Sequence, residues 1–178
     1  MTFVKAAGGD SCFDLPENNG ELVYEWYDTY LKPRLNTMKV CYETSGCWNE
    51  TDTYLLNGVI SKEPDNATSR PGIGLGYGII SAILQDGTYI TLNIWTNSGI
   101  ISRLKTDAEK EENSLVIFFD INGKRKPNVI GKDIFCVVYL PEVGLVPAYK
   151  NAGYSAVKQD CSSSGKGFSC IMKYLNNN

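Results

Sequence analysis

Two aspartates and two asparagines stand close together in the segment DINGKRKPNVIGKD, where their side-chain oxygens could do chemistry. The four residues are Asp120, Asn122, Asn128 and Asp133. Carboxylate and amide oxygens are the hard ligands that Ca²⁺ prefers, so this set, together with backbone carbonyls, is a candidate calcium site. The spacing is not that of an EF-hand loop, and the three cations of the intervening KRK sequence oppose a bound cation.

The same segment also suits a connection that holds no metal. Asp120 can form an Asx turn, Gly123 can adopt positive φ, and Asp133 can cap the return of the chain into the next strand. A third interpretation makes Asp120 and Asp133, or either of them with Glu142, an acid/base pair of the glycosidase kind. The sequence indicates neither the separation of these carboxyl groups nor a substrate cleft. The structural interpretation is therefore favoured, and no catalytic residue is assigned.

The composition argues against an enzyme and against a nucleic-acid-binding protein. The 178 residues include no histidine, which removes the commonest general base and every Ser-His or Cys-His nucleophile pair. The net charge is −3, and no basic cluster is denser than GKRK at 123–126. A nucleic-acid-binding surface would normally show a basic stripe, so no nucleic-acid partner is expected.

The six cysteines predict disulfides and an oxidising compartment. Two pairs are close in sequence and bracket turn-rich links. They are Cys41 with Cys47 and Cys161 with Cys170. Closing such short loops would stabilise the fold by roughly 2–3 kcal/mol each. Cys136 stands in the apolar run IFCVVYL and is either a buried thiol or the partner of Cys12 in a third pair.

The elements that must position these residues begin with a helix. In the stretch ELVYEWYDTYL at 21–31, apolar residues recur at intervals of three and four, which is typical of an amphipathic helix. Pro33 should interrupt the helix near Leu31. The aromatic residues of this stretch are expected to pack against a sheet.

Four strands are expected after the helix. Asp86-Gly87 joins two β-rich runs within 77–95 and predicts a hairpin, and SLVIFFD and KDIFCVVYL supply two further strands. The sequence therefore predicts an α+β fold in a single domain over 1–178. In it the N-terminal helix packs on an antiparallel β-sheet of about four strands, followed by a disulfide-tied C-terminal loop.

This order of elements resembles type IV pilin-like proteins, specifically the pseudopilin-like subunits of type II secretion systems. The resemblance covers residues 77–175. Its most specific part is the pattern D-x-N-G-x-x-x-P-N-x-x-G-x-D-x-F at 120–135, whereas the DGT sequence of the hairpin is a weak signal alone.

The resemblance implies a pilin-like head domain and a non-enzymatic structural subunit of a filament or a type II secretion apparatus, acting by assembly. Its partners would be other pilin-like subunits and secretion-system components. An apolar N-terminal helix would anchor it in the inner membrane, with residues 1–8 as the remnant of that helix in a trimmed chain. The head would lie in the cell envelope, periplasmic or extracellular. Some pseudopilins hold Ca²⁺ in a loop near this region, which adds to the calcium interpretation.

A second function comes from a different class. Trp48 and Trp95, with tyrosines nearby, could line the binding face of a secreted ligand- or carbohydrate-binding module. Core packing is the competing interpretation of both tryptophans, because large aromatic side chains dominate protein cores.

Overall fold

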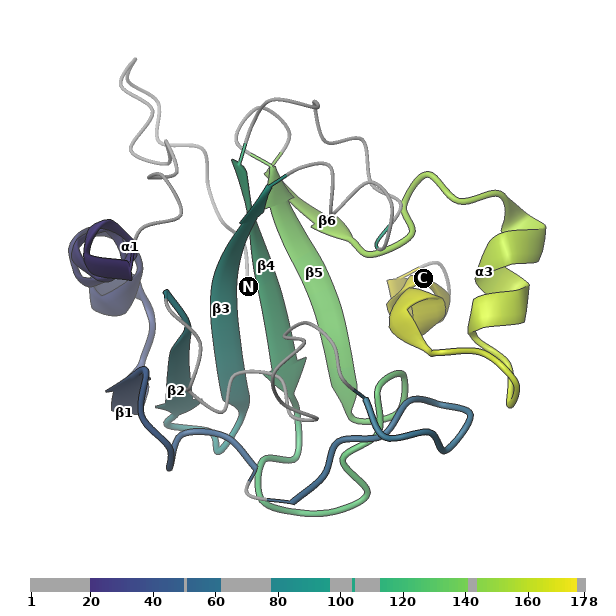
Figure 1. Cartoon of the computed structure of the whole chain (residues 1–178), viewed down its shortest axis with the longest axis horizontal. Coiled ribbons are helices and arrows are strands. Elements are labelled where there is room, and N and C mark those ends of the chain that lie inside the picture. The colour runs from purple at the N-terminus through teal and green to yellow at the C-terminus, as the bar shows by residue number, and fades with distance from the viewer. Residues whose placement is uncertain are drawn as a thin grey trace.

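An antiparallel sheet of six strands forms the centre of the fold in the computed structural model (Figure 1). The structure describes residues 20–49, 51–61, 78–96 (backbone only for 95 and 96), 104, 113–140 and 144–175. The strands follow one another across the sheet in chain order. They are β1 (Thr37–Tyr42), β2 (Ile80–Leu84), β3 (Tyr89–Thr96), β4 (Asn113–Asp120), β5 (Ile134–Leu140) and β6 (Gly144–Pro147).

The helices of the described chain are short. The first, α1 (Gly20–Trp26), continues through a π-helical turn at Tyr27–Leu31 and a 3-10 turn at Lys32–Arg34. The C-terminal part contains α3 (Tyr154–Asp160), a 3-10 turn at Phe168–Cys170 and α4 (Ile171–Leu175). None of the helices in the described ranges is long and apolar enough to cross a membrane.

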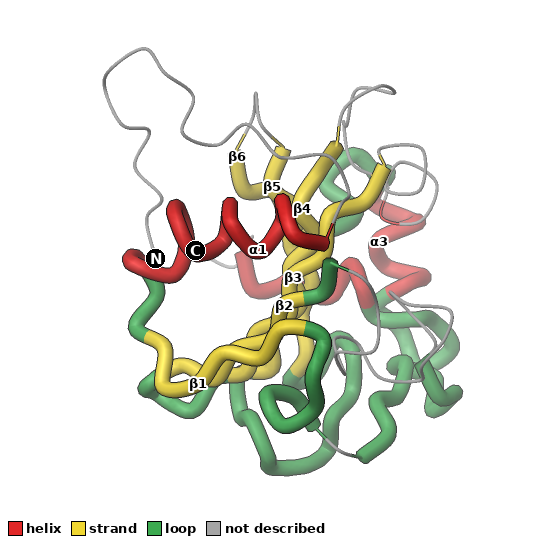
Figure 2. Tube along the Cα trace, turned by 60° about the vertical axis from the view of Figure 1, so that its left-hand side comes forward, coloured by secondary structure: helices red, strands yellow, loops and turns green. Residues whose placement is uncertain are grey.

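Helix α1 and its π-helical continuation cover one face of the sheet (Figure 2). Their buried residues recur at three- and four-residue intervals, so they point to the same side. This set packs against apolar residues of β2, β3 and β4 and consists of Val23, Trp26, Tyr27 and Leu31. The predicted helix therefore has the predicted apolar face. The chain leaves the helical conformation one residue after Pro33, at the end of the 3-10 turn, and Leu35 is extended.

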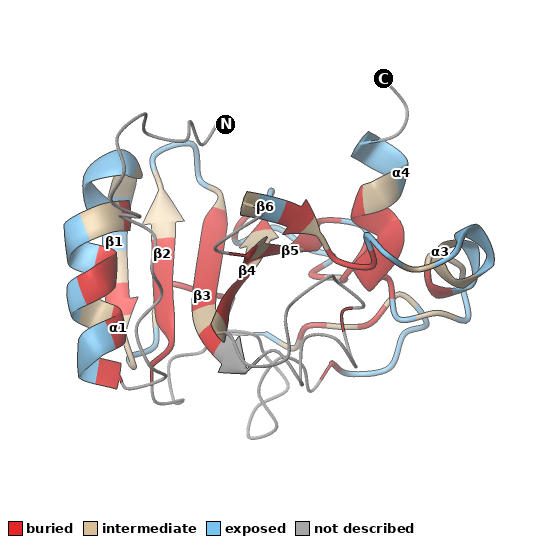
Figure 3. Cartoon of the chain, turned by 90° about the horizontal axis from the view of Figure 1, so that it is seen from above, coloured by how far each residue is buried: buried red, intermediate tan, exposed pale blue. Residues whose placement is uncertain are grey.

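The opposite face of the sheet packs against loops and the C-terminal helices (Figure 3). Because successive strand residues point to opposite faces, Val116 and Phe118 of β4 face this side, whereas Leu115 packs on the α1 side. Phe118 meets the ring of Phe168 edge-on, with the ring centroids 6.2 Å apart. Cys136 of β5 is buried in the same cluster. The sheet thus carries a core on each face.

The hairpin predicted at Asp86-Gly87 is confirmed and joins β2 to β3. Gly87 has a φ of +87°, which glycine adopts without steric cost. The carboxylate of Asp86 accepts a hydrogen bond from the backbone N–H of Thr88, at 2.9 Å. Local turn chemistry therefore fixes this register, as expected from the sequence.

The predicted fold class is wrong. An α+β fold with a helix on about four strands was expected, but the structure is a β-rich fold of six strands with only short helices. The two strands that the prediction missed are the edge strands. β1 directly follows the interrupted helix, and β6 has four residues and ends at Pro147. β6 is too short to show an alternation, and in β1 buried and exposed residues do not alternate along the strand.

We predict that Tyr27→Phe stabilises the protein. Tyr27 is fully buried, and its hydroxyl has no hydrogen-bond partner within the described chain. An unsatisfied buried hydroxyl costs about 1–3 kcal/mol, so its removal should raise the free energy of unfolding by about 1 kcal/mol in urea denaturation. The matched control is Tyr24→Phe, which should destabilise because the Tyr24 hydroxyl donates to the Glu43 carboxylate and accepts from the backbone N–H of Gly78. A lower stability for Tyr27→Phe would contradict the prediction.

Candidate functional site

The four predicted site residues come together in the connection between β4 and β5, at the lower end of the sheet in Figure 1. Asp120 ends β4, and Asp133 immediately precedes β5. Asp120 is 0% exposed, Asn128 2% and Asp133 4%. The backbone N–H of Ile121 donates to the carbonyl oxygen of Asp133 at 3.0 Å, which closes the base of the connection.

Asp120 forms the predicted turn at the start of the connection. One carboxylate oxygen accepts hydrogen bonds from the backbone N–H groups of Asn122 and Gly123, at 3.1 and 3.0 Å. The other oxygen accepts from the side-chain amide of Asn49, at 2.5 Å. Gly123 has a φ of +60°, and a Cβ there would lie 2.3 Å from the carbonyl oxygen of Gly87. Glycine is therefore required at this position.

Asp133 holds the far side of the connection. Its Oδ1 accepts from the backbone N–H of Val129 at 2.6 Å. Its Oδ2 accepts from the backbone N–H of Asn128 at 2.8 Å and from the side-chain amide of Asn122 at 3.1 Å. Both carboxylates of the cluster are thus surrounded by N–H donors of the chain itself.

A distant segment also takes part in this cluster, and sequence reasoning missed it. Asn49 lies 71 residues before its partner Asp120. The side-chain amide of Asn128 donates to the hydroxyl of Thr51 at 2.7 Å, and the backbone N–H of Tyr54 donates to the Asn128 carbonyl at 2.9 Å. The sequence marks Asn49 and Thr51 only as the ends of an Asn-x-Thr tripeptide, which gives no indication of their contacts with Asp120 and Asn128.

Burial decides the electrostatics of the cluster. Burial raises the pKa of Asp120 to about 6, and the nearby charge of Asp133 also raises it. The hydrogen bonds from Asn122 and Asn49 lower this pKa, but each by less than burial raises it. The ion pair within the described chain joins Lys32 to Asp28, away from this cluster. Hydrogen bonds, rather than lysine or arginine side chains, therefore stabilise these two carboxylates.

Protein N–H groups occupy most of the carboxylate lone pairs that Ca²⁺ would use in this cluster. N–H donors point at the carboxylate oxygens of Asp120 and Asp133, where a bound cation would need free lone pairs. Among the described residues, no group of three or more His, Cys, Asp or Glu side chains could hold a metal. The amide oxygens of Asn122 and Asn128 have no partner there and are the acceptors left over. These contacts favour the structural interpretation.

The acid/base interpretation gains no support from the described carboxylates. A general acid or base has to reach the substrate within hydrogen-bond distance. Asp120 is fully buried and Asp133 nearly so, and both are engaged by protein N–H groups. Glu142, the third residue of that hypothesis, lies outside the described residues.

The prediction that the chain carries disulfides is confirmed. The structure joins Cys41 to Cys47, with Cα atoms 5.9 Å apart, and Cys161 to Cys170, with Cα atoms 4.9 Å apart. Cys136 is a buried free thiol, and burial raises its pKa far above the ordinary range. Cys12, its proposed partner, lies outside the described residues.

One of the two tryptophans of the proposed aromatic binding face is buried. Trp48 is 4% exposed and packs beside the ring of Tyr89, with the ring centroids 6.5 Å apart. It belongs to the core and offers no face to a sugar. The side chain of Trp95 lies outside the described residues.

Comparison with known proteins adds no relative to this description. No protein family matches the chain, and neither a curated protein nor a solved structure matches it. Its function has to be inferred from the chain's own residues.

We predict that Asp120 makes stability fall as pH rises. Its carboxyl group titrates near pH 4 in an unfolded chain, whereas in the folded protein the pKa is about 6. The folded state binds the proton more tightly, so this stabilising contribution is complete below about pH 4 and is lost as pH rises through about 6. The free energy of unfolding should fall by at most about 3 kcal/mol between these limits, with a slope no steeper than roughly 1.4 kcal/mol per pH unit.

The control for the pH prediction is Asp120→Asn. Its amide oxygen still accepts the backbone N–H groups of Asn122 and Gly123, and Asn49 can turn its own amide to present an oxygen. Urea denaturation of both proteins across this pH range isolates the titration of one group. Parallel curves for the two proteins would show that Asp120 has an ordinary pKa.

We expect the melting temperature to be unchanged by EDTA and by added Ca²⁺, because protein N–H groups already engage the carboxylates of Asp120 and Asp133. A ligand that binds only the native state raises stability with its concentration, so a melting curve at several Ca²⁺ concentrations is a direct test. A rise that Asp133→Asn abolishes would instead establish a calcium site. Mg²⁺ at the same concentrations controls for ionic strength.

Proposed function

We propose that the protein is a non-enzymatic structural subunit that acts by assembly, as the head domain of a pilin-like filament or a type II secretion apparatus. The observation that carries this proposal is the structural role of the aspartates in the 120–135 pattern. Its two aspartates are buried and engaged by the chain's own N–H groups, so the most distinctive residues hold the fold and offer nothing to a substrate.

The edges of the sheet supply surfaces suited to assembly. β1 and β6 are the edge strands of the described sheet, and edge strands present unpaired backbone groups to a neighbouring chain. Each also carries an exposed apolar side chain, Met38 on β1 (63% exposed) and Leu145 on β6 (38%). Two unlike edges allow one subunit to contact two neighbours through different surfaces.

The disulfides support an envelope location for this subunit. Disulfides persist in oxidising compartments such as the periplasm or the exterior, and two short loops of the chain are closed in this way. The partners in this proposal are other pilin-like subunits and secretion-system components.

The second candidate is a secreted ligand-binding module. The observation in its favour is a pocket of about 370 Å³ beside the Cys161–Cys170 disulfide, with the exposed ring of Tyr174 at its wall. The burial of Trp48 argues against the carbohydrate-binding form of this candidate. The two candidates differ in whether copies of the chain associate.

We predict that photo-cross-linking in the native host will trap covalent multimers of this chain. A benzophenone amino acid replaces Met38 in one variant and Leu145 in another, and the products are resolved by denaturing electrophoresis and mass spectrometry. At least one edge should give a ladder that contains peptides of two copies or of another pilin-like subunit. The reason is that an assembled subunit holds its edges against neighbours.

Gln85 provides the matched control position. It is exposed in the turn between β2 and β3 and lies on neither edge strand. Cross-links at the edges that exceed those at Gln85 support assembly through the sheet edges. Monomers alone at all three positions would overturn the proposed function.

A further inference from the structure

A pocket of about 370 Å³ lies beside the Cys161–Cys170 disulfide. Three parts of the chain form its walls: the segment around Leu56, the turn that precedes β5, and the C-terminal region from the disulfide loop into α4. Apart from the two disulfide cysteines, the residues of this pocket were not among the candidate site residues of the sequence, and its ligand chemistry is still unassigned.

The wall formed by the turn before β5 is pressed against the disulfide. Gly131 has a φ of +88°, and a Cβ at this position would lie 2.8 Å from the sulfur of Cys170 and 2.8 Å from the carbonyl oxygen of Gly167. On the adjoining side, the backbone N–H of Leu56 donates to the carbonyl of Lys166 at 3.0 Å. Close backbone packing of this kind fixes the pocket before any ligand arrives.

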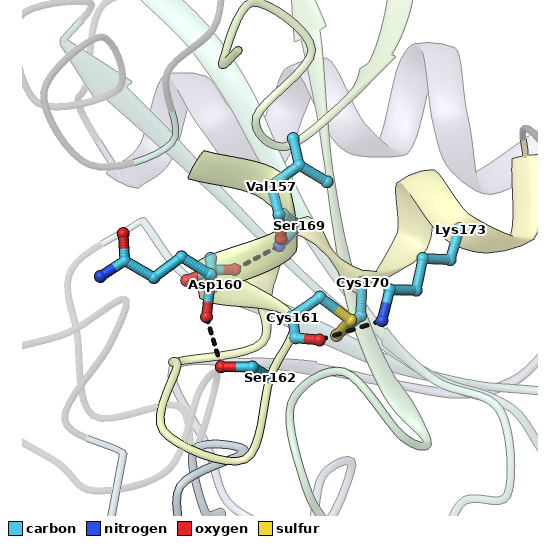
Figure 4. Close-up of a disulfide and its surroundings, with 8 residues drawn as sticks. Val157, Asp160, Cys161, Ser162, Ser169, Cys170 and Lys173 are labelled. Carbon is cyan, nitrogen blue, oxygen red and sulfur yellow. Dashed lines mark hydrogen bonds between the residues drawn. A yellow bond between two sulfur atoms is a disulfide. The ribbon is translucent and has the colours of Figure 1, made fainter. Parts of the chain in front are cut away.

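Hydrogen bonds also hold the disulfide loop (Figure 4). The carboxylate of Asp160 accepts from the backbone N–H of Ser169 at 2.7 Å, and the Ser169 hydroxyl donates to the Val157 carbonyl at 3.0 Å. The Asp160 carbonyl accepts from the N–H of Gly167 at 3.0 Å. The loop residues that line the pocket therefore have defined positions.

The charge of the pocket is positive although the chain is acidic overall. Lys132 and Lys173 line it, and no aspartate or glutamate does. Neither lysine forms an ion pair with a carboxylate of the described residues. The ammonium group of Lys173 donates to the carbonyl oxygen of Cys161 at 3.0 Å, which holds it at the pocket and leaves further N–H donors for a ligand.

The pocket is also lined by neutral polar and aromatic side chains. Ser162 and Ser163 add hydroxyl groups to its lining. Ser163 is exposed and can donate its hydroxyl proton to an anion, whereas the single proton of the Ser162 hydroxyl is already donated to the Gln159 carbonyl at 2.6 Å. Tyr174 is 61% exposed, and its ring can cover the carbon skeleton of a bound molecule.

We infer that this pocket binds an anionic group, a carboxylate or a phosphate, carried by a small molecule or by a partner. Lysine ammonium groups bind such oxygens through charge-assisted hydrogen bonds, which are stronger than neutral ones. This inference does not depend on the proposed function, because either an assembly subunit or a ligand-binding module could use the pocket.

The test is isothermal titration calorimetry of the full chain at low ionic strength. Citrate and inorganic phosphate are titrated in separate experiments. We expect at least one of the two probes to bind with one-to-one stoichiometry and to weaken as NaCl is added. The double variant Lys132→Gln/Lys173→Gln should weaken that binding by on the order of tenfold or more, because it removes two charge-assisted contacts. Binding of citrate alone identifies a carboxylate site, and binding of phosphate alone a phosphate site.

A matched control distinguishes binding in the pocket from a general effect of the protein's net charge. Lys150→Gln/Lys158→Gln makes the same change in net charge at two exposed lysines that do not line the pocket, and it should leave the affinity within about twofold. If loss of the Lys173–Cys161 contact unfolds the first variant, Lys132→Gln alone decides the question. Equal losses in both double variants, or no heat from either probe with the unmodified protein, would overturn the inference.

Discussion

The carboxylate of Asp133 is the constraint on which the connection between β4 and β5 depends. It accepts hydrogen bonds from N–H groups of Asn122, Asn128 and Val129, which lie at the beginning and in the second half of this connection. Asp120 does the same at the start of the connection and draws in Asn49 from a distant segment. Asp133 therefore holds the connection together, and Asp120 joins the end of the sheet to the segment around Asn49.

This arrangement explains how one residue pattern can suggest a metal, a catalyst or a structural loop. Aspartate and asparagine oxygens serve all three, and the sequence does not say which atoms face them. In the structure, backbone N–H groups face the carboxylates of Asp120 and Asp133. The identity of the donors, more than the identity of the acceptors, decides the chemistry of such a loop.

Local features were predictable from the sequence, and distant ones were not. The Asp86-Gly87 hairpin, the Asx turn at Asp120 and the central strands β2–β5 follow from residues a few positions apart. The edge strands β1 and β6 carry no clear alternation of buried and exposed residues and gain their structure by pairing with neighbours. Asn49 could not be recognised either, because its role depends on a partner 71 residues away. The two lysines of the pocket likewise meet only in the folded chain.

The burial of Asn49 has a practical consequence for producing the protein. Asn49 and Thr51 are the first and last residues of an Asn-Glu-Thr tripeptide, which is the acceptor sequence for N-linked glycans in eukaryotic secretion. In the folded chain the Asn49 amide nitrogen is bound to Asp120, and the Thr51 hydroxyl accepts from Asn128. A sugar attached there during synthesis would prevent the cluster from closing. A host without this modification is therefore the suitable one for obtaining the native fold.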